Sequence, residues 1–122
     1  MPKRSRSLDL DEFEDFLDWD PEDWERGNRA HFLEHGIDEQ VVEEVLYGNS
    51  WVNVEMTVES AEFAVVGPNW AWNFMWTLLF APSRRRGDVL RPITGWDSKP
   101  REIREWERLA GNEWTGSRQK YP

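Results

Sequence analysis

Basic side chains that can bind phosphate gather in the last third of this 122-residue chain. Residues 84–122 hold ten of the fifteen lysines and arginines against six acids, a local balance of +4. Arginine suits phosphate because its planar guanidinium can bind two oxygens at once. Alternatively, the run 84–86 is a solvated turn and position 91 faces outward from a strand. The candidate phosphate-binding residues are Arg84, Arg85, Arg86, Arg91, Lys99 and Arg101.

His35 offers acid–base chemistry, because imidazole titrates near neutral pH. Alternatively, it is a helix C-terminal residue favoured by the helix dipole. His31 lies four residues earlier, a spacing that can place both imidazoles on one metal ion. No third ligand of suitable type and spacing is evident, and the chain has no cysteine, so we expect neither a metal nor a cofactor.

Tryptophan is unusually abundant, with nine residues in the chain. Trp70, Trp72 and Trp96 could stack on nucleic acid bases. They could equally belong to the core or anchor a partner protein, since aromatic side chains concentrate at interfaces. The acidic character of the chain favours core or partner contact over RNA stacking.

The net charge of -9 is unevenly distributed, because residues 1–83 hold five basic residues against eighteen acids, a balance of -13. A polyanion could therefore bind only to the C-terminal third. The acidic stretch Asp9–Asp23 could alternatively imitate nucleic acid toward a basic protein. Pro2–Ser7 is basic without a following apolar stretch, and Asn73–Ala81 is too short to cross a bilayer. We therefore expect a cytoplasmic protein without membrane contact.

The hydrophobic pattern predicts an α+β domain with two N-terminal helices, a mainly antiparallel four-stranded sheet and a C-terminal helix. Asp20 and Pro21 are expected to begin the first helix, which Gly36 ends, and Asp38 to begin the second, which Gly48 ends. The expected strands are Trp51–Val58, Glu62–Val66, Asn73–Ala81 and Val89–Thr94, and the last helix runs from Ser98 to Gly111.

Asn73–Ala81 is apolar on both faces and should be the central strand. Pro92 requires an edge or a bulge in the last strand, because proline cannot donate to a ladder. Residues 1–18 are expected to form a flexible arm, 19–111 the domain, and 112–122 a tail. Leu8–Asp18 could instead be a short strand or a docking segment for a partner.

Several short motifs occur together in a fixed order: Trp19-Asp20-Pro21, Asn28, His35-Gly36-Ile37, Glu43-Glu44-Val45, Phe63-Ala64-Val65-Val66-Gly67, Trp76-Thr77-Leu78-Leu79-Phe80 and Leu90-Arg91-Pro92-Ile93-Thr94. In order and spacing they resemble the BrnT family of type II toxins, over roughly Trp19–Leu109. The resemblance implies a compact RelE-like fold and a metal-independent ribonuclease that stalls translation. It also implies a small DNA-binding antitoxin that silences the toxin and through which the pair would contact operator DNA.

On this first hypothesis Arg91 is catalytic, with His35 or Glu55 as the acid–base group. The chain departs from the family at Ile93-Thr94-Gly95-Trp96-Asp97-Ser98, where family members typically carry Ile-Ser-Ala-Arg-Arg-Ala. Trp96 and Asp97 thus stand in place of two arginines. The second hypothesis is therefore a non-catalytic interaction protein that keeps the fold and binds a protein partner.

Overall fold

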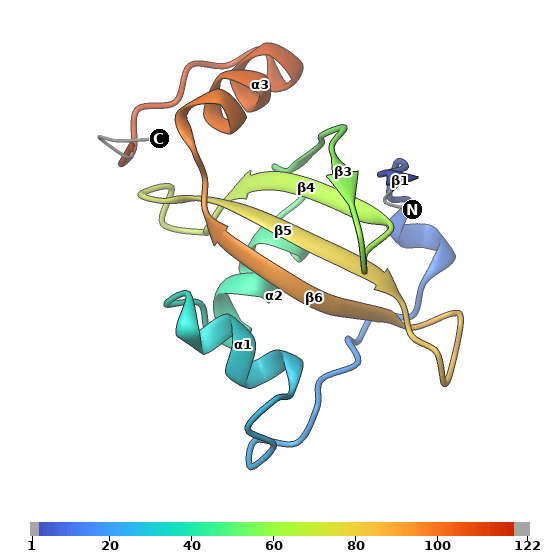
Figure 1. Ribbon diagram of the computed structural model, residues 1–122. Coiled ribbons are helices and arrows are strands. Elements are labelled where there is room, and N and C mark those ends of the chain that lie inside the picture. The colour runs from blue at the N-terminus through green and yellow to red at the C-terminus, as the bar shows by residue number, and fades with distance from the viewer. Residues whose placement is uncertain (1–2, 119–122) are drawn as a thin grey trace.

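A four-stranded antiparallel sheet with helices on both faces forms the centre of the computed structural model, which describes residues 3–118 (Figure 1). The strand order is β2-β4-β5-β6, and a separate two-stranded sheet pairs β1 with β3. This architecture confirms the predicted α+β class. The strands are β1 (Lys3–Arg4), β2 (Val52–Asn53), β3 (Thr57–Val58), β4 (Phe63–Pro68), β5 (Met75–Pro82) and β6 (Leu90–Asp97). The helices are the short 3-10 helix η1 (Leu10–Glu12) and α1 (Asn28–Glu34), α2 (Glu39–Tyr47) and α3 (Pro100–Ala110).

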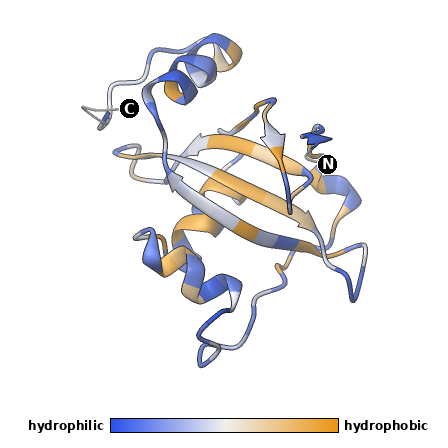
Figure 2. Ribbon diagram, in the orientation of Figure 1, coloured by the Kyte–Doolittle hydropathy of each residue, from blue (hydrophilic) through white to orange (hydrophobic). Residues whose placement is uncertain are grey.

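Two apolar clusters lie on opposite faces of the sheet, and β5 contributes to both. Leu78 and Phe80 of β5 lie in the cluster with Phe32 of α1 and the apolar face of α2. Met75 and Leu79 lie in the other cluster, with Ile103 and Trp106 of α3. Figure 2 shows apolar residues along β4 and in parts of β5. The prediction of a central strand buried on both sides is confirmed.

The predicted start of the first helix is wrong. Residues 21–27 form turns, and α1 begins only at Asn28, with Gly27 as its N-cap. The predicted end is right, because Gly36 adopts a left-handed φ of 74°. The second helix follows its prediction, because the Asp38 carboxylate accepts a hydrogen bond from the Val41 N–H at 2.9 Å.

The predicted strand Trp51–Val58 is divided into β2 and β3, which join different sheets. β6 lies at the edge of the main sheet, and its pairing with β5 shifts register where Leu79 pairs with Thr94 but Phe80 pairs with Pro92. Pro92 thus occupies an edge strand beside a bulge, as predicted.

Both end segments of the described chain lie against the domain. In the N-terminal segment, Leu8 is only 5% exposed, and Leu17 forms an isolated bridge with Leu90 of β6. At the other end Trp114 is 3% exposed and belongs to the α3-side core. Leu109, near the end of α3, is 45% exposed, whereas Trp114, which follows the left-handed turn at Gly111, lies in the core.

Candidate functional site

Arg91 lies near the start of β6 and forms a two-point ion pair with Asp20. Its Nη1 lies 3.0 Å from Asp20 Oδ1 and its Nη2 lies 2.8 Å from Asp20 Oδ2. Asp18 adds a second carboxylate at 3.6 Å from Nη1. The hydrogen bond with Asp20 raises the pKa of Arg91, and the same bond lowers the pKa of Asp20. The guanidinium fork that a phosphate would need is therefore occupied by a carboxylate of the same chain.

Asn28 connects this ion pair to the first turn of α1. Its N–H donates to Asp20 Oδ2 at 2.8 Å, and its side-chain oxygen accepts from the Asp20 N–H at 2.9 Å. Its amide nitrogen donates to the carbonyls of Asp18 and Pro92. Asn28 is only 5% exposed. We call this arrangement of Asp20, Asn28 and Arg91 the latch, because it joins the segment before α1 to the edge strand β6.

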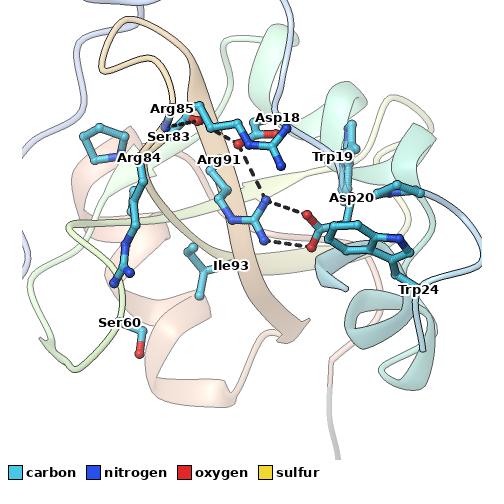
Figure 3. Close-up of a pocket in the computed structure, with 13 residues that line it drawn as sticks. Asp18, Trp19, Asp20, Trp24, Ser60, Ser83, Arg84, Arg85, Arg91 and Ile93 are labelled. Atoms are coloured by element: carbon cyan, nitrogen blue, oxygen red, sulfur yellow. Dashed lines mark hydrogen bonds and ion pairs between the residues drawn. The ribbon is translucent and has the colours of Figure 1, made fainter. Parts of the chain in front are cut away.

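A cleft of about 510 Å³ opens beside the latch (Figure 3). Figure 3 shows Arg91 at its centre, with Asp20 and Trp24 on one side and Arg84 on the other. Arg85 also lines the cleft, and the Ser83 hydroxyl donates to Asp18 Oδ2 at 2.7 Å. The lining therefore includes three guanidinium groups and two carboxylates, which leaves a small positive excess.

Arg86 does not join Arg84 and Arg85 at this cleft. It binds both carboxylate oxygens of Asp88, lies 3.7 Å from Glu14, and stands over the Phe16 ring. Of the three consecutive arginines, Arg84 and Arg85 thus face the cleft, whereas Arg86 is paired with Asp88 outside it.

The other predicted phosphate-binding residues lie at a different place. Lys99 and Arg101 follow the far end of β6 and line a cleft of about 630 Å³. Glu55 and Trp96 line the same cleft. An eight-residue strand is about 26 Å long, and Arg91 lies near its other end. The sheet therefore separates the predicted basic residues into two groups.

The second group surrounds Glu102, a carboxylate that is only 6% exposed. Its Oε1 accepts hydrogen bonds from the Lys99 N–H at 2.8 Å, the Trp96 indole at 2.9 Å and the Thr77 hydroxyl at 3.0 Å. The Trp96 indole N–H is thereby bound within the chain. Glu55 forms an ion pair with Arg4 on the surface, and its side chain is 66% exposed. Glu55 is therefore not shielded from water as an acid–base group in an active site would be.

His35, the predicted acid–base residue, is exposed at the C-terminal end of α1. It lines neither of the two clefts to which Arg91 contributes. His31 is the better-placed imidazole. Its Nε2 lies 2.9 Å from the Thr94 hydroxyl of β6, and it lines a cleft of about 310 Å³ with Arg26 and Arg91. Helical spacing alone could not distinguish the two histidines. The contact with Thr94 of β6 is what brings His31, and not His35, to the cleft that Arg91 also lines.

The loop between β4 and β5 exposes three aromatic side chains. Trp70 is 66% exposed, Trp72 is 44% exposed and Phe74 is 39% exposed. We call these three residues the aromatic platform. Trp72 also contacts buried rings, with its centroid 5.8 Å from that of Trp106 and 6.0 Å from that of Trp114. Of the three tryptophans singled out in the sequence, Trp70 and Trp72 are therefore surface residues, and Trp96 belongs to the Glu102 network.

Hydrogen bonds fix the shape of this loop. The Asn69 N–H donates to the Phe74 carbonyl at 3.2 Å, and the Trp72 N–H donates to the Asn69 carbonyl at 3.0 Å. The Asn69 side chain binds both Asn73 and the Phe74 N–H. The Trp70 N–H donates to Glu44 of α2 at 2.9 Å. Trp72 takes a left-handed φ of 56°, a conformation that these contacts hold in place.

No protein-family model, curated protein or solved structure matches this chain significantly. Within residues 3–118, no group of three or more histidines, aspartates or glutamates is placed to hold a metal ion. The same part of the chain contains no helix long and apolar enough to cross a membrane.

Proposed function

We propose that this chain is a protein-binding module that contacts its partner through the aromatic platform. The observation that carries the proposal is the exposure of Trp70, Trp72 and Phe74 on a loop whose shape is fixed by hydrogen bonds. Exposed aromatic anchors supply much of the energy of protein interfaces. A loop that is ordered before binding loses little entropy when the partner arrives. Burial of Trp106 and Trp114 beneath Trp72 supplies the fixed support.

The pairing of Arg91 with Asp20 favours a protein-binding function over phosphate chemistry. Its two-point pair with Asp20 would have to break before it could bind a phosphate in the same way. Breaking the pair would leave two carboxylates close to the incoming anion, because Asp18 lies 3.6 Å from the guanidinium. The latch is therefore better suited to holding the fold together than to binding RNA.

The partner that we propose is the small DNA-binding protein implied by the resemblance to BrnT toxins. The chain would contact operator DNA only through this partner, since its own net charge is -9. The complex would be cytoplasmic, without membrane contact. The test produces this chain with an affinity tag together with an untagged copy of the proposed partner.

The test is whether the partner co-purifies at a fixed ratio with wild-type chain and is lost with Trp70→Ala. Trp24→Ala is the matched control, because Trp24 is 50% exposed but lies at the latch cleft. Retention of the partner by Trp70→Ala would refute the proposal, as would equal loss from both variants.

The second candidate function is an endoribonuclease that inhibits translation, as the first sequence hypothesis stated. It is favoured by one observation: His31, Arg26 and Arg91 line the same cleft of about 310 Å³. His31 would remove the proton from an RNA 2′-hydroxyl, whose oxygen attacks the adjacent phosphorus while the 5′-oxygen leaves with a proton from a second acid. Arg26 would stabilise the charge that develops on phosphorus.

A cleavage assay on mixed cellular RNA in the presence of EDTA tests this candidate. Cleavage should disappear in His31→Ala and persist in His35→Ala, because of the two histidines only His31 lines this cleft. Cleavage that is unaffected by His31→Ala would remove this residue assignment. Absence of cleavage by the folded wild-type protein would remove the candidate function.

A further inference from the structure

A groove of about 740 Å³ lies between α1 and α2. Ala30 and Leu33 of α1 supply apolar surface, and Leu33 is 57% exposed. The residues around them are mostly acidic. We call this the α1–α2 groove. Its acidic lining residues are Glu22, Asp38, Glu39 and Glu43, and Arg29 and Gln40 complete the lining with Ala30 and Leu33.

The groove carries a net negative charge. Arg29 is the one cation among its lining residues, and it forms an ion pair with Glu39. Burial, with a contribution from Glu39, raises the pKa of Glu43. Apolar surface between carboxylates suits a segment that has both aliphatic and cationic side chains.

Hydrogen bonds on the surface of α2 connect the α1–α2 groove to the aromatic platform. Gln40 lines the groove and donates to Glu44 Oε2 at 3.0 Å. Glu44 Oε1 in turn accepts from the Trp70 N–H at 2.9 Å. The Trp70 indole lies against Gly48, directly after α2. One face of α2 thus joins an acidic, partly apolar groove to an exposed tryptophan.

We propose that the α1–α2 groove and Trp70 together bind a basic, amphipathic segment of a partner protein. Lysine or arginine side chains of the segment would face Glu22, Glu39 and Glu43, an aliphatic side chain would cover Leu33, and a further apolar side chain would contact Trp70. This inference rests on the proposed function and specifies the chemistry of its partner. α2 has nine residues, or about 14 Å, so a segment of roughly a dozen residues would cover the surface.

A fluorescein-labelled amphipathic peptide of lysine and leucine, roughly a dozen residues long, is the probe, and a glutamate–leucine peptide of the same pattern is its control. Fluorescence anisotropy measures the Kd of the lysine–leucine peptide for the full chain at about 0.01 M and about 0.15 M salt. Glu22→Gln/Glu43→Gln should weaken binding about threefold to tenfold at the lower salt concentration. Leu33→Ser should weaken it about fivefold at both.

The matched control is Glu59→Gln/Glu113→Gln, which removes the same charge from exposed positions outside the groove. It should change Kd less than about twofold. Equal weakening by both double variants would overturn the inference, because binding would then report net charge alone. Binding of the glutamate–leucine peptide would also overturn it.

Sedimentation of the chain by itself tests the competing occupant, a second copy that places its basic C-terminal third in the groove. Self-association that is lost in Glu22→Gln/Glu43→Gln would replace the partner segment with a second copy and overturn the inference. A monomer in both samples supports it. Failure of these groove variants would leave the Trp70→Ala co-purification result standing, so the two proposals fail separately.

Discussion

The guanidinium of Arg91 and the carboxylate of Asp20 meet through two hydrogen bonds across 71 residues of sequence, at 3.0 Å and 2.8 Å. The carboxylate side chain is 14% exposed and that of the arginine 28%. Partial burial makes the loss of one partner costly, because the other charge then lacks compensation. This ion pair and the bridge between Leu17 and Leu90 both hold the segment before α1 against β6.

We expect Arg91→Ala to lower the free energy of unfolding by about 2 kcal/mol, the range for a lost hydrogen bond between charged groups. Arg91→Lys should lose about half as much, since an ammonium cannot bind both carboxylate oxygens in the same geometry. Urea denaturation measures both. An Arg91→Ala variant as stable as the wild type would show that the latch does not hold the fold together.

Acid should weaken the latch. The Arg91 hydrogen bond lowers the pKa of Asp20 in the folded chain, below the unfolded value of about 3.9. The folded state then binds its proton less readily, so the stabilisation is complete above the unfolded pKa and is lost as pH falls through the folded pKa. Asp20→Asn should therefore be less stable than wild type at pH 7, by about 1–2 kcal/mol.

This difference between wild type and Asp20→Asn should shrink as the pH falls below the unfolded pKa. Equilibrium unfolding at a series of pH values measures it. A constant difference across that range would mean that the stabilisation does not come from the ionised carboxylate.

Gly95 of β6 should tolerate no side chain. A Cβ there would lie 2.7 Å from Leu78 Cδ2 and 2.9 Å from both Phe32 Cε1 and the Thr77 carbonyl. We expect Gly95→Ala to cost about 1–3 kcal/mol of stability, as overpacking does in a core. Gly87→Ala is the control, because nothing lies within 4 Å of its added carbon, and its effect should stay within about 0.5 kcal/mol. Equal stabilities in thermal unfolding would show that α1 is not packed closely on β6.

Glu102→Ala should destabilise the start of α3 by about 2 kcal/mol, because the Lys99 N–H and the Trp96 indole would lose their shared acceptor. Glu102→Gln keeps a side-chain oxygen at that position and should recover part of the loss. Urea denaturation of the two variants makes the comparison. If Glu102→Ala were as stable as the wild type, the carboxylate oxygen would not hold this network.

Local sequence patterns identify the elements whose structure depends on neighbouring residues. Asn73–Ala81 is apolar on both faces, and β5 is the central strand. Asp38 and Gly48 mark the limits of α2, because each acts on the backbone next to it. Trp51–Val58 alternates like one strand, yet β2 and β3 join different sheets. No local pattern distinguishes a continuous strand from one whose two ends pair with separate partners.

The candidate site depends on contacts between distant residues, which spacing does not reveal. Asp20 has the sequence context of an N-cap for Pro21, but its carboxylate binds Arg91 and the Asn28 N–H. Lys99 and Arg91 are close in sequence, but Arg91 lies near the start of β6 and Lys99 lies beyond its end. Composition indicated tryptophans at a surface, and burial distinguishes the exposed Trp70 from Trp114, which is 3% exposed.

The most direct test of partner binding through the platform is the Kd of the purified natural partner, measured by titration calorimetry for wild type, Trp70→Ala and Trp24→Ala. Because Trp70 is 66% exposed, its substitution should leave the fold intact. We predict a loss of at least about 2 kcal/mol for Trp70→Ala, or about 30-fold in Kd, and less than about threefold for Trp24→Ala. A Trp70→Ala variant that binds as tightly as the wild type would contradict the account.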